Sequence, residues 1–305
     1  MTTNQFSEGC AFIDGEYVSI AEARIPIIDT GFTRSDLTYD VVAVWNGKFF
    51  RIDDHLDRFK QSWRRLRMKP DISLEKMREI LFECVRRSGL RNAYVEMILS
   101  RGIDEDGSRD PRRFRNRFYA YAIPYVWIVK PENQKDGIHL VVAEKTTRIP
   151  TNAVDPMVKN FHWGDLIRGI YEAYDRGGYT VVLPNSGGHI TEGPGFNVFL
   201  YDEGTLLTPA TGVLKGITRQ TVLDLAEEQG ISARMDMFGA HVLENADEVF
   251  ITSTAGGVMP VTTVNGKSIG DGKPGKVTTL IQKRYWGAHN EDRWATPVDY
   301  PTEIQ

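Results

Sequence analysis

The sequence predicts a mixed α/β protein of the α+β class with two domains, on three observations. The chain has 305 residues, and single hydrophobic cores stop growing near roughly 250–300 residues. Segments with the period of strands are mixed with segments with the period of helices. The most linker-like composition lies at 130–137. We therefore expect a small N-terminal domain at 1–129, a linker at 130–137, a larger domain at 138–286 and an irregular tail at 287–305.

The first domain begins with two predicted β-hairpins. Asp14-Gly15 and Asn46-Gly47 each lie between apolar stretches, an arrangement that favours a two-residue type I′ turn. Asp53 is the predicted N-cap of the helix that follows, because apolar residues recur after it at spacings of three and four.

A second helix is predicted between Ser73, its N-cap, and Gly89, which supplies a left-handed C-terminal stop. A strand is expected at 92–99. The segment 101–117 mixes Gly, Asp, Ser and Pro with charged residues and has no apolar period, so we expect a loop there.

The second domain is predicted to mix strands with two helices. The apolar runs predict strands at 139–143, 180–183, 197–201 and 249–252, and amphipathic spacing predicts helices at 165–176 and 219–229.

Composition excludes several classes of function. Lys and Arg number 37 against 41 Asp and Glu, which gives a formal charge of 37 − 41 = −4 and argues against nucleic acid as a partner. No apolar run reaches the ~20 residues that span a bilayer. The two cysteines form no CxxC pair and the six histidines have no metal-ligand spacing. We expect a cytoplasmic protein with no metal site.

One phosphate-binding pattern is rejected. Gly270, Gly275 and Lys276 have the spacing GxxxxGK, but Val277 replaces the Ser or Thr that would hold magnesium, and Pro274 lacks a backbone donor. A surface turn is the better interpretation.

Two other segments could bind an anion. Gly216-Ile217-Thr218-Arg219 opens a predicted helix with Thr218 as N-cap, and a helix N terminus suits a phosphate. Thr252 to Gly257 ends a strand with hydroxyl groups and small residues. An ordinary capped helix and an ordinary turn are the commoner structures for such sequences.

Two charged residues are candidates for chemistry. Lys159 lies in an unusually aromatic and apolar segment, where burial would lower its pKa and make its amine a nucleophile. Glu192 ends a predicted strand beside a Gly-rich turn. Taken alone, each is more commonly a surface charge.

Read together, these segments resemble the fold type IV pyridoxal 5′-phosphate aminotransferases, the superfamily of branched-chain and D-amino acid aminotransferases. The resemblance covers the chain from about Ala11 to Trp286. It is carried by Asp29-Thr30-Gly31-Phe32, Ser35-Asp36-Leu37-Thr38-Tyr39, Asp54-His55-Leu56-Asp57-Arg58, Val158-Lys159-Asn160, Thr191-Glu192-Gly193, Gly216-Ile217-Thr218-Arg219 and Thr254-Ala255-Gly256-Gly257.

The resemblance implies a two-domain fold whose larger, pyridoxal-phosphate-binding domain has a β-barrel-like core. It implies that Lys159 forms the internal Schiff base and moves the catalytic proton, and that Glu192 pairs with the pyridine nitrogen. The cofactor-binding residues that it implies are Arg58, Lys159, Glu192, Ile217, Thr218, Ser253 and Thr254.

Within the superfamily, the chain is most similar to the (R)-selective amine transaminases. Branched-chain enzymes carry an arginine at the position of Glu96, and D-amino acid enzymes use an arginine and a histidine in the loop where this chain has Arg109 and Pro111. Arg109 is the candidate for binding the keto-acid carboxylate. The resemblance assigns substrate contacts to Tyr39, Val41, Tyr94, Glu96, Arg109, Trp163, Thr254 and Ala255.

The expected function is therefore transfer of an amino group from an (R)-configured primary amine to a keto acid such as pyruvate. A D-amino acid aminotransferase is the first alternative and a branched-chain aminotransferase the second. A catalytically silent pyridoxal-phosphate-binding protein is the non-enzyme alternative. The resemblance also implies a homodimer with its sites near the subunit interface.

Overall fold

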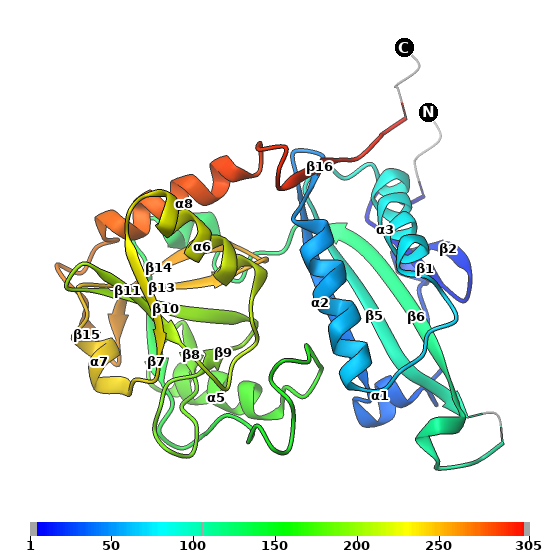
Figure 1. The fold of residues 1–305 in the computed structure, drawn as a ribbon, viewed down its shortest axis with the longest axis horizontal. Helices are drawn as coiled ribbons and strands as arrows, with labels where there is room; N and C mark the ends of the chain where they lie inside the picture. The colour runs from blue at the N-terminus through cyan, green and yellow to red at the C-terminus, as the bar shows by residue number, and fades with distance from the viewer. Residues whose placement is uncertain (1–4, 105, 302–305) are drawn as a thin grey trace. The chain divides into compact units, whose positions relative to one another are not determined.

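The computed structural model describes residues 5–104 and 106–301, which divide into two compact units (Figure 1). Unit 1 holds the chain up to Val126, the segment 158–161 and the residues from His289. Unit 2 holds residues 127–157 and 162–288. The segment that we expected to be a linker lies in unit 2 and contains a short helix, α4 (Pro131–Gln134), which begins with a proline at its first turn.

Unit 1 is built on a seven-stranded antiparallel sheet of order β16-β4-β3-β5-β6-β1-β2. Its strands are β1 (Cys10–Ile13), β2 (Glu16–Ser19), β3 (Leu37–Trp45), β4 (Lys48–Phe50), β5 (Ala93–Asp104), β6 (Phe114–Pro124) and β16 (Ala295–Pro297). Its helices are η1 (Ile20–Glu22), α1 (Thr30–Arg34), α2 (Ile52–Arg65), α3 (Leu74–Ser88) and η2 (Pro111–Arg113).

Both predicted hairpins are confirmed. Asp14 and Gly15 have φ angles of 52° and 88°, and Asn46 and Gly47 have 50° and 77°. Two consecutive positive φ angles are the signature of a type I′ turn, which matches the twist of the paired strands. These turns fix the β1–β2 and β3–β4 registers.

The second predicted helix is confirmed at both ends, because the Ser73 side chain accepts a hydrogen bond from Lys76 N and Gly89 is left-handed at φ 72°. The predicted N-cap of the first helix is wrong. Arg51, in the left-handed conformation, is the N-cap of α2, and Asp53 lies in its first turn, where its charge favours the positive end of the helix.

The loop predicted at 101–117 is wrong at both of its ends. β5 continues to Asp104 and β6 begins at Phe114, so the two strands form a long antiparallel ribbon. Backbone hydrogen bonds between the two strands hold this ribbon together, although its sequence has no apolar period. Gly102 lies at φ 93°, and a Cβ atom there would come within 1.8 Å of the Arg115 carbonyl oxygen, so the bulge in the ribbon requires glycine.

The two faces of the unit 1 sheet have different surroundings. Val42, Val95 and Ala120 point to the face on which α2 and α3 pack, and they belong to the hydrophobic core of this unit (Figure 1). The residues that alternate with them, among them Val41 and Glu96, point to the opposite face. α2 and α3 therefore cover one face only, and on the other face Gly31 of α1 packs against Ser100 of β5.

A buried ionic cluster joins α2 to β3. Asp40 is completely buried, and its two oxygens accept hydrogen bonds from Arg58 Nε and Nη2 at 2.7 Å each. His55 Nδ1 lies 2.8 Å from Asp40 Oδ1. Burial acts to raise the pKa of Asp40, but Arg58 and His55 outweigh it and hold that pKa well below its usual value.

Unit 2 contains a nine-stranded sheet whose main path is β12-β11-β10-β13-β14-β7-β8, with β9 paired to β10 and β15 to β14. This sheet is the centre of the unit for which the resemblance implied a barrel-like core. Its strands are β7 (Ile138–Val142), β8 (Thr180–Val182), β9 (Glu192–Gly193), β10 (Phe196–Asp202), β11 (Thr205–Pro209), β12 (Ser232–Asp236), β13 (Glu248–Ser253), β14 (Gly257–Val264) and β15 (Lys267–Ser268).

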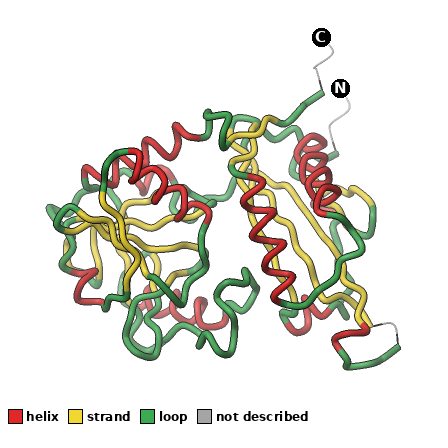
Figure 2. Tube along the Cα trace, viewed as in Figure 1, coloured by secondary structure: helices red, strands yellow, loops and turns green. Residues whose placement is uncertain are grey.

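The helices of unit 2 are α4, α5 (Gly164–Asp175), α6 (Ile217–Glu228), α7 (Ala240–Glu244) and α8 (Lys276–Ala288). Figure 2 shows the strands of this unit in yellow, bordered by these helices in red. All four predicted strands and both predicted helices of this region are present, so the mixed α+β class is confirmed. Thr218 is not an N-cap, however, because α6 begins at Ile217 with Gly216 as its cap.

The end of the chain is more regular than expected. α8 continues to Ala288, and residues 295–297 form β16, which pairs with β4. The pairing places Ala295 opposite Phe50, so the C-terminal segment completes the sheet of unit 1. No helix among the described residues is long and apolar enough to cross a membrane.

A protein carboxylate occupies the N terminus of α8, where the rejected GxxxxGK pattern lies. Glu248 accepts hydrogen bonds from Val277 N at 3.0 Å and from Thr278 N and Oγ1 at 2.7 Å each. A Cβ atom at Gly275 would come within 1.9 Å of the Glu248 side chain. The amides that would bind a phosphate are therefore already used by Glu248.

Replacing Glu248 with alanine should destabilise the protein by about 1–2 kcal/mol, the usual cost of losing a helix N-terminal acceptor. The measurement is the midpoint of urea unfolding. Glu227→Ala is the matched control, because Glu227 is an exposed glutamate of α6. Equal midpoints for the two variants would contradict the capping role.

Stability should fall as the pH falls below about 6.5, the unperturbed pKa of histidine, partly because of His55. Burial lowers the pKa of His55, although Asp40 acts to raise it. Below pH ~6.5 the unfolded chain binds a proton that folded His55 does not, so the unfolded state is favoured by up to about 1.4 kcal/mol per pH unit. Urea unfolding at pH 7.5 and 5.5 should therefore show a smaller pH effect in His55→Gln than in the parent. The exposed His241, changed to Gln, should leave the pH effect unaltered.

Candidate active site

Lys159 lies in the segment 158–161, which belongs to unit 1 and is fixed against the edge of β3. The Lys159 carbonyl oxygen accepts hydrogen bonds from Thr38 Oγ1 at 2.8 Å and from Tyr39 N at 3.1 Å. Its Nζ lies 4.3 Å from the centroid of the Tyr39 ring, and the ring of Phe161 lies 4.5 Å from the same ring. The lysine amine is thus held against an aromatic face, where its cationic form is attracted to the ring.

Glu96 is a buried carboxylate on the same sheet face as Tyr39. Glu96 is only 5% exposed, and its Oε2 accepts hydrogen bonds from Tyr94 OH at 3.0 Å and Tyr121 OH at 2.8 Å. Burial raises the pKa of Glu96, while the two tyrosine hydroxyls and the charge of Lys159 act to lower it. Neither protonation state of this group supplies positive charge.

The structure brings together four of the predicted substrate residues with Lys159. Tyr39 and Val41 are buried in one cluster, against which Tyr94 packs, and Glu96 lies opposite Val41 in the β3–β5 register. These contacts follow from strand alternation, which places every second residue of a strand on the same face.

Arg109 does not lie with them. It is exposed in the connection between β5 and β6, beyond the end of β5. From Glu96 to Asp104 the strand rises about 26 Å at roughly 3.3 Å per residue. Trp163 belongs to unit 2, where it packs beside a small cluster that includes Leu166.

Arg58 is the predicted phosphate-binding arginine of unit 1. Asp40 holds its guanidinium by the two-point contact described above, and 12% of the Arg58 side chain is exposed. Such a fork restricts the guanidinium to one orientation. Asp40 thus positions Arg58 and is itself held by His55. The resemblance included His55 in a motif but gave neither residue this role.

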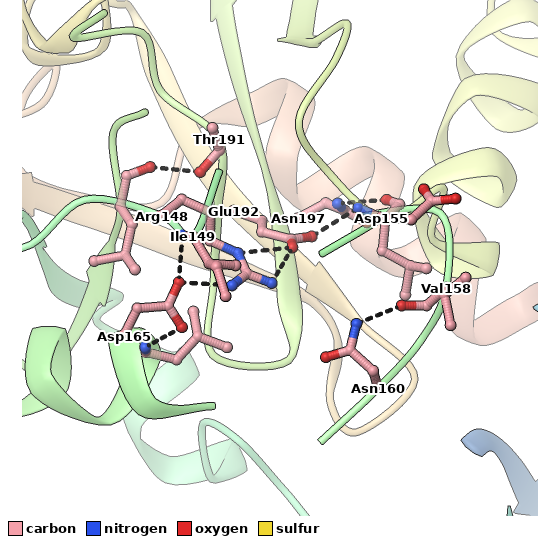
Figure 3. Close-up of polar contacts among 12 residues, drawn as sticks. Arg148, Ile149, Asp155, Val158, Asn160, Asp165, Thr191, Glu192 and Asn197 are labelled. Atoms are coloured by element: carbon pink, nitrogen blue, oxygen red, sulfur yellow. Dashed lines mark hydrogen bonds and ion pairs between the residues drawn. The ribbon is translucent and has the colours of Figure 1, made fainter. Parts of the chain in front are cut away.

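Glu192 is buried in unit 2 and held by a cation. Arg148 Nε and Nη2 donate to Glu192 Oε1 at 3.2 and 3.1 Å, and Leu214 N donates to Oε2 at 2.8 Å (Figure 3). The same arginine donates from Nη1 to Asp165 Oδ2 at 2.7 Å. A Cβ atom at Gly193 would come within 2.1 Å of the Phe196 ring, so only glycine fits after the glutamate.

The start of α6 is fixed by two residues of the sheet. Leu214 donates its N–H to Glu192, and its carbonyl accepts a hydrogen bond from Asn197 Nδ2 at 3.0 Å. A Cβ atom at Gly216 would come within 2.2 Å of Asn197 Oδ1. Glu192 and the N terminus of α6, which the sequence suggested separately, are therefore connected through Leu214.

The N terminus of α6 is suited to an anion. No side chain caps it, and its first turn contains no acidic residue. In that turn Arg219 is only 4% exposed, and its partners are the neutral acceptors Thr208 Oγ1 and Pro209 O. Burial lowers the pKa of Arg219. A buried cation at the positive end of a helix makes this end of α6 strongly electropositive, in contrast to α8 with its Glu248 cap.

The segment after β13 is shaped by hydroxyl groups and glycines. Ser253 Oγ donates to Gly195 O at 2.8 Å and accepts a hydrogen bond from Ala255 N at 3.2 Å. Thr254 lies between these two anchored residues. Gly257 has φ 71°, and a Cβ atom there would come within 2.7 Å of Tyr285.

Sequence patterns did not identify Arg148, Asp165 and Asn197 as site residues, and Arg219 stood in the Gly216-Ile217-Thr218-Arg219 motif without a role of its own. Asn197 was the one with a visible signal, since it is a polar residue at the start of an apolar strand. Arg148 and Asp165 are ordinary charged residues in the sequence, and only their burial distinguishes them.

Comparison with known proteins gives a consistent result. Residues 37–264 match the family model of the amino-transferase class IV proteins. The chain is 26% identical to the branched-chain-amino-acid aminotransferase of Escherichia coli K12, over 93% of this chain and 94% of that relative. It is 26% identical to the D-alanine aminotransferase of Staphylococcus haemolyticus, over 90% of this chain and 95% of that relative.

Solved structures agree with these relatives. The branched-chain aminotransferase of Thermoproteus uzoniensis, solved with norvaline, superposes with a TM-score of 0.87 at 26% identity and covers 95% of this chain and 99% of its own. Another branched-chain amino acid aminotransferase, solved with pyridoxamine 5′-phosphate, superposes with a TM-score of 0.89 at 25% identity, over 96% of this chain and 99% of its own. With the family model matching most of the chain, these likenesses identify the protein as a member of the class IV aminotransferases, enzymes that use pyridoxal 5′-phosphate.

Proposed function

We propose that this aminotransferase moves the amino group of an (R)-configured primary amine to a keto acid such as pyruvate. The products are then a ketone and an amino acid, so the reaction needs no further reactant. The proposal is supported by the resemblance of Tyr94-Val95-Glu96 and Lys159-Asn160 to the (R)-selective amine transaminases, and by the charge of the face that carries them.

The residues present fit the three parts of pyridoxal phosphate. Lys159 supplies an amine for its carbonyl group. The backbone of Ile217 and Thr218, together with Ser253 and Thr254, suits its phosphate, because the α6 N terminus is uncapped and has a buried cation beside it. Glu192 is a buried carboxylate that suits a protonated ring nitrogen, and Arg58 is a second cation for the phosphate.

When bound, the cofactor supplies an aldehyde and a ring that withdraws electrons from the reacting carbon. The protein must then hold and move one proton. Lys159 Nζ is the group that we assign to this step, since its backbone is anchored by Thr38 and Tyr39 while its side chain lies along the Tyr39 ring.

The substrate class is inferred from Glu96. An enzyme that binds amino acids through this face would need a cation for the substrate carboxylate, as the position of Glu96 provides in branched-chain enzymes. Here the position holds a carboxyl group that two tyrosines fix in place. A negative or neutral group attracts no carboxylate. This face therefore favours amines that carry an apolar substituent in place of the amino-acid carboxylate. Tyr39, Val41, Tyr94, Trp163 and Ala255 are the proposed contacts of that substituent.

The D-amino acid aminotransferase is the second candidate, favoured by the D-alanine aminotransferases among the relatives. It would rely on Arg109 for the substrate carboxylate. Arg109 lies beyond Asp104, which is itself about 26 Å along the strand from Glu96, so we propose that Arg109 would act on a second copy of the chain. This is one reason to propose a homodimer.

We also propose a cytoplasmic location. The two cysteines, Cys10 and Cys84, are buried and free, which is compatible with it.

With pyruvate as acceptor, the purified enzyme should turn over (R)-1-phenylethylamine faster than its (S) enantiomer and faster than D-alanine. Formation of acetophenone or, for D-alanine, exchange of label into pyruvate measures the rates. Lys159→Ala should lower kcat by about 100- to 10,000-fold, the usual effect of a proton-transferring group. Lys145→Ala, which removes an exposed lysine of the preceding segment, should have no effect.

Turnover of D-alanine without turnover of either amine would replace the proposal by the D-amino acid candidate. A protein that binds the cofactor but transfers no amino group from any of these donors would be a silent binding protein.

Changing Glu96 to Gln should lower KM for D-alanine roughly fivefold, because removal of one like charge near a substrate carboxylate relieves about 1 kcal/mol of repulsion. KM for (R)-1-phenylethylamine should change little. Steady-state kinetics with both donors measures the contrast, and Glu16→Gln, at an exposed position of β2, is the control. The same change in KM for both donors would contradict the assignment.

A further inference from the structure

We propose that Arg148 is a positioning residue that fixes Glu192, in ionised form, for the ring nitrogen of the cofactor. The inference rests on the proposed role of Glu192 and adds to it a residue that neither the motifs nor the resemblance identified. Arg148 acts through Glu192 and is therefore not itself a catalytic residue.

The first support is the geometry of the contact. Figure 3 shows Arg148 between two carboxylates, Glu192 and Asp165. Two of its nitrogens donate to a single oxygen of Glu192, Oε1, at 3.2 and 3.1 Å. Because Leu214 N donates to the other oxygen, rotation of the Glu192 carboxylate would break hydrogen bonds at both ends.

The second support is that Arg148 is itself immobilised. Its backbone N–H donates to Pro184 O at 2.8 Å, and its Nη1 donates to Asp165 Oδ2 at 2.7 Å. Asp165 is fixed in turn, since Oδ2 also accepts a hydrogen bond from Ile149 N at 2.7 Å and Oδ1 accepts one from Leu166 N at 2.9 Å. A rigid donor can impose its orientation on Glu192, whereas a mobile one could not.

The third support is the charge of the cluster. The side chains of Arg148, Glu192 and Asp165 are 10%, 10% and 14% exposed. Burial acts to lower the pKa of Arg148, but the charges of Glu192 and Asp165 outweigh it and raise that pKa. One guanidinium between two carboxylates carries a net charge of about −1, and a protonated ring nitrogen would neutralise it.

The guanidinium therefore has two effects on Glu192. Its permanent positive charge favours the carboxylate over the carboxylic acid, and the carboxylate is the form that makes an ion pair with a protonated ring nitrogen. The excess negative charge of the cluster in turn favours the protonated ring, which is the form that withdraws electrons.

The test compares Arg148→Met, Arg148→Lys and Glu192→Gln in the enzyme loaded with pyridoxal phosphate labelled with ¹⁵N at the ring. The ¹⁵N resonance reports the protonation of the ring nitrogen directly. Arg148→Met and Glu192→Gln should both move it toward the unprotonated value and lower kcat by about 10- to 100-fold, as loss of a supporting residue usually does, with a smaller change in KM. Arg148→Lys, which keeps the charge but loses the fork, should restore part of both.

Two further variants sharpen the result. The double variant of Arg148→Met with Glu192→Gln should be no worse than Glu192→Gln alone, because the two residues act as one unit. Arg168→Met is the matched control, since Arg168 is an exposed arginine of α5, and it should leave the resonance unchanged. If Arg148→Met does not fold, Arg148→Lys serves as the test. A resonance in Arg148→Lys that is shifted from the parent value toward the unprotonated value would then support the inference.

A resonance that moves in Glu192→Gln but stays at the parent value in the Arg148 variants would overturn the inference and leave the role of Glu192 intact. A resonance that moves in none of them would overturn both. These two failures are therefore distinguishable in one experiment.

Discussion

The pairing of β3, β5 and β6 is the constraint on which the unit 1 part of the site depends. In this register Val41, Glu96 and Tyr121 lie side by side across the three strands. Their neighbours along the strands, such as Val42 and Val95, form the core with α2 and α3. A shift of one residue would exchange the two sets, because side chains alternate between the faces of a strand. The same interaction that buries the core of unit 1 therefore also presents Glu96 and Tyr39 to Lys159.

Buried charges in this protein are compensated in two different ways. The Asp40 carboxylate meets Arg58 and His55, and Glu192 meets Arg148, so each of these carboxylates has a fixed cationic partner. Arg219 differs, since both its hydrogen-bond acceptors are neutral. A buried charge without a counter-charge is unfavourable in the protein alone. The phosphate that we propose at the N terminus of α6 would supply the missing negative charge.

Local sequence signals predicted many of the features that depend on neighbouring residues, although the N-caps predicted at Asp53 and Thr218 were wrong. The turns at Asp14-Gly15 and Asn46-Gly47, the Ser73 cap and the Gly89 stop each need only a few consecutive residues, and all are present. The sequence signals failed where the structure depends on contacts between distant segments. The ribbon of β5 and β6 is held by pairing across its whole length, and β16 forms because β4 offers it an edge. Neither partner is visible in a short window of sequence.

By itself the sequence determined the mixed α+β class, the order of the elements that it predicted and, through its motifs, the family and the candidate lysine and glutamate. These follow from local periodicity and from residue spacing, which the chain carries without folding. Only the tertiary structure decided which charges are buried together. Arg148, Asp165 and Asn197 are ordinary polar residues in the sequence, yet they fix Glu192 and the start of α6. The reason is physical, since desolvation gives a charge its influence, and burial arises only when distant segments pack.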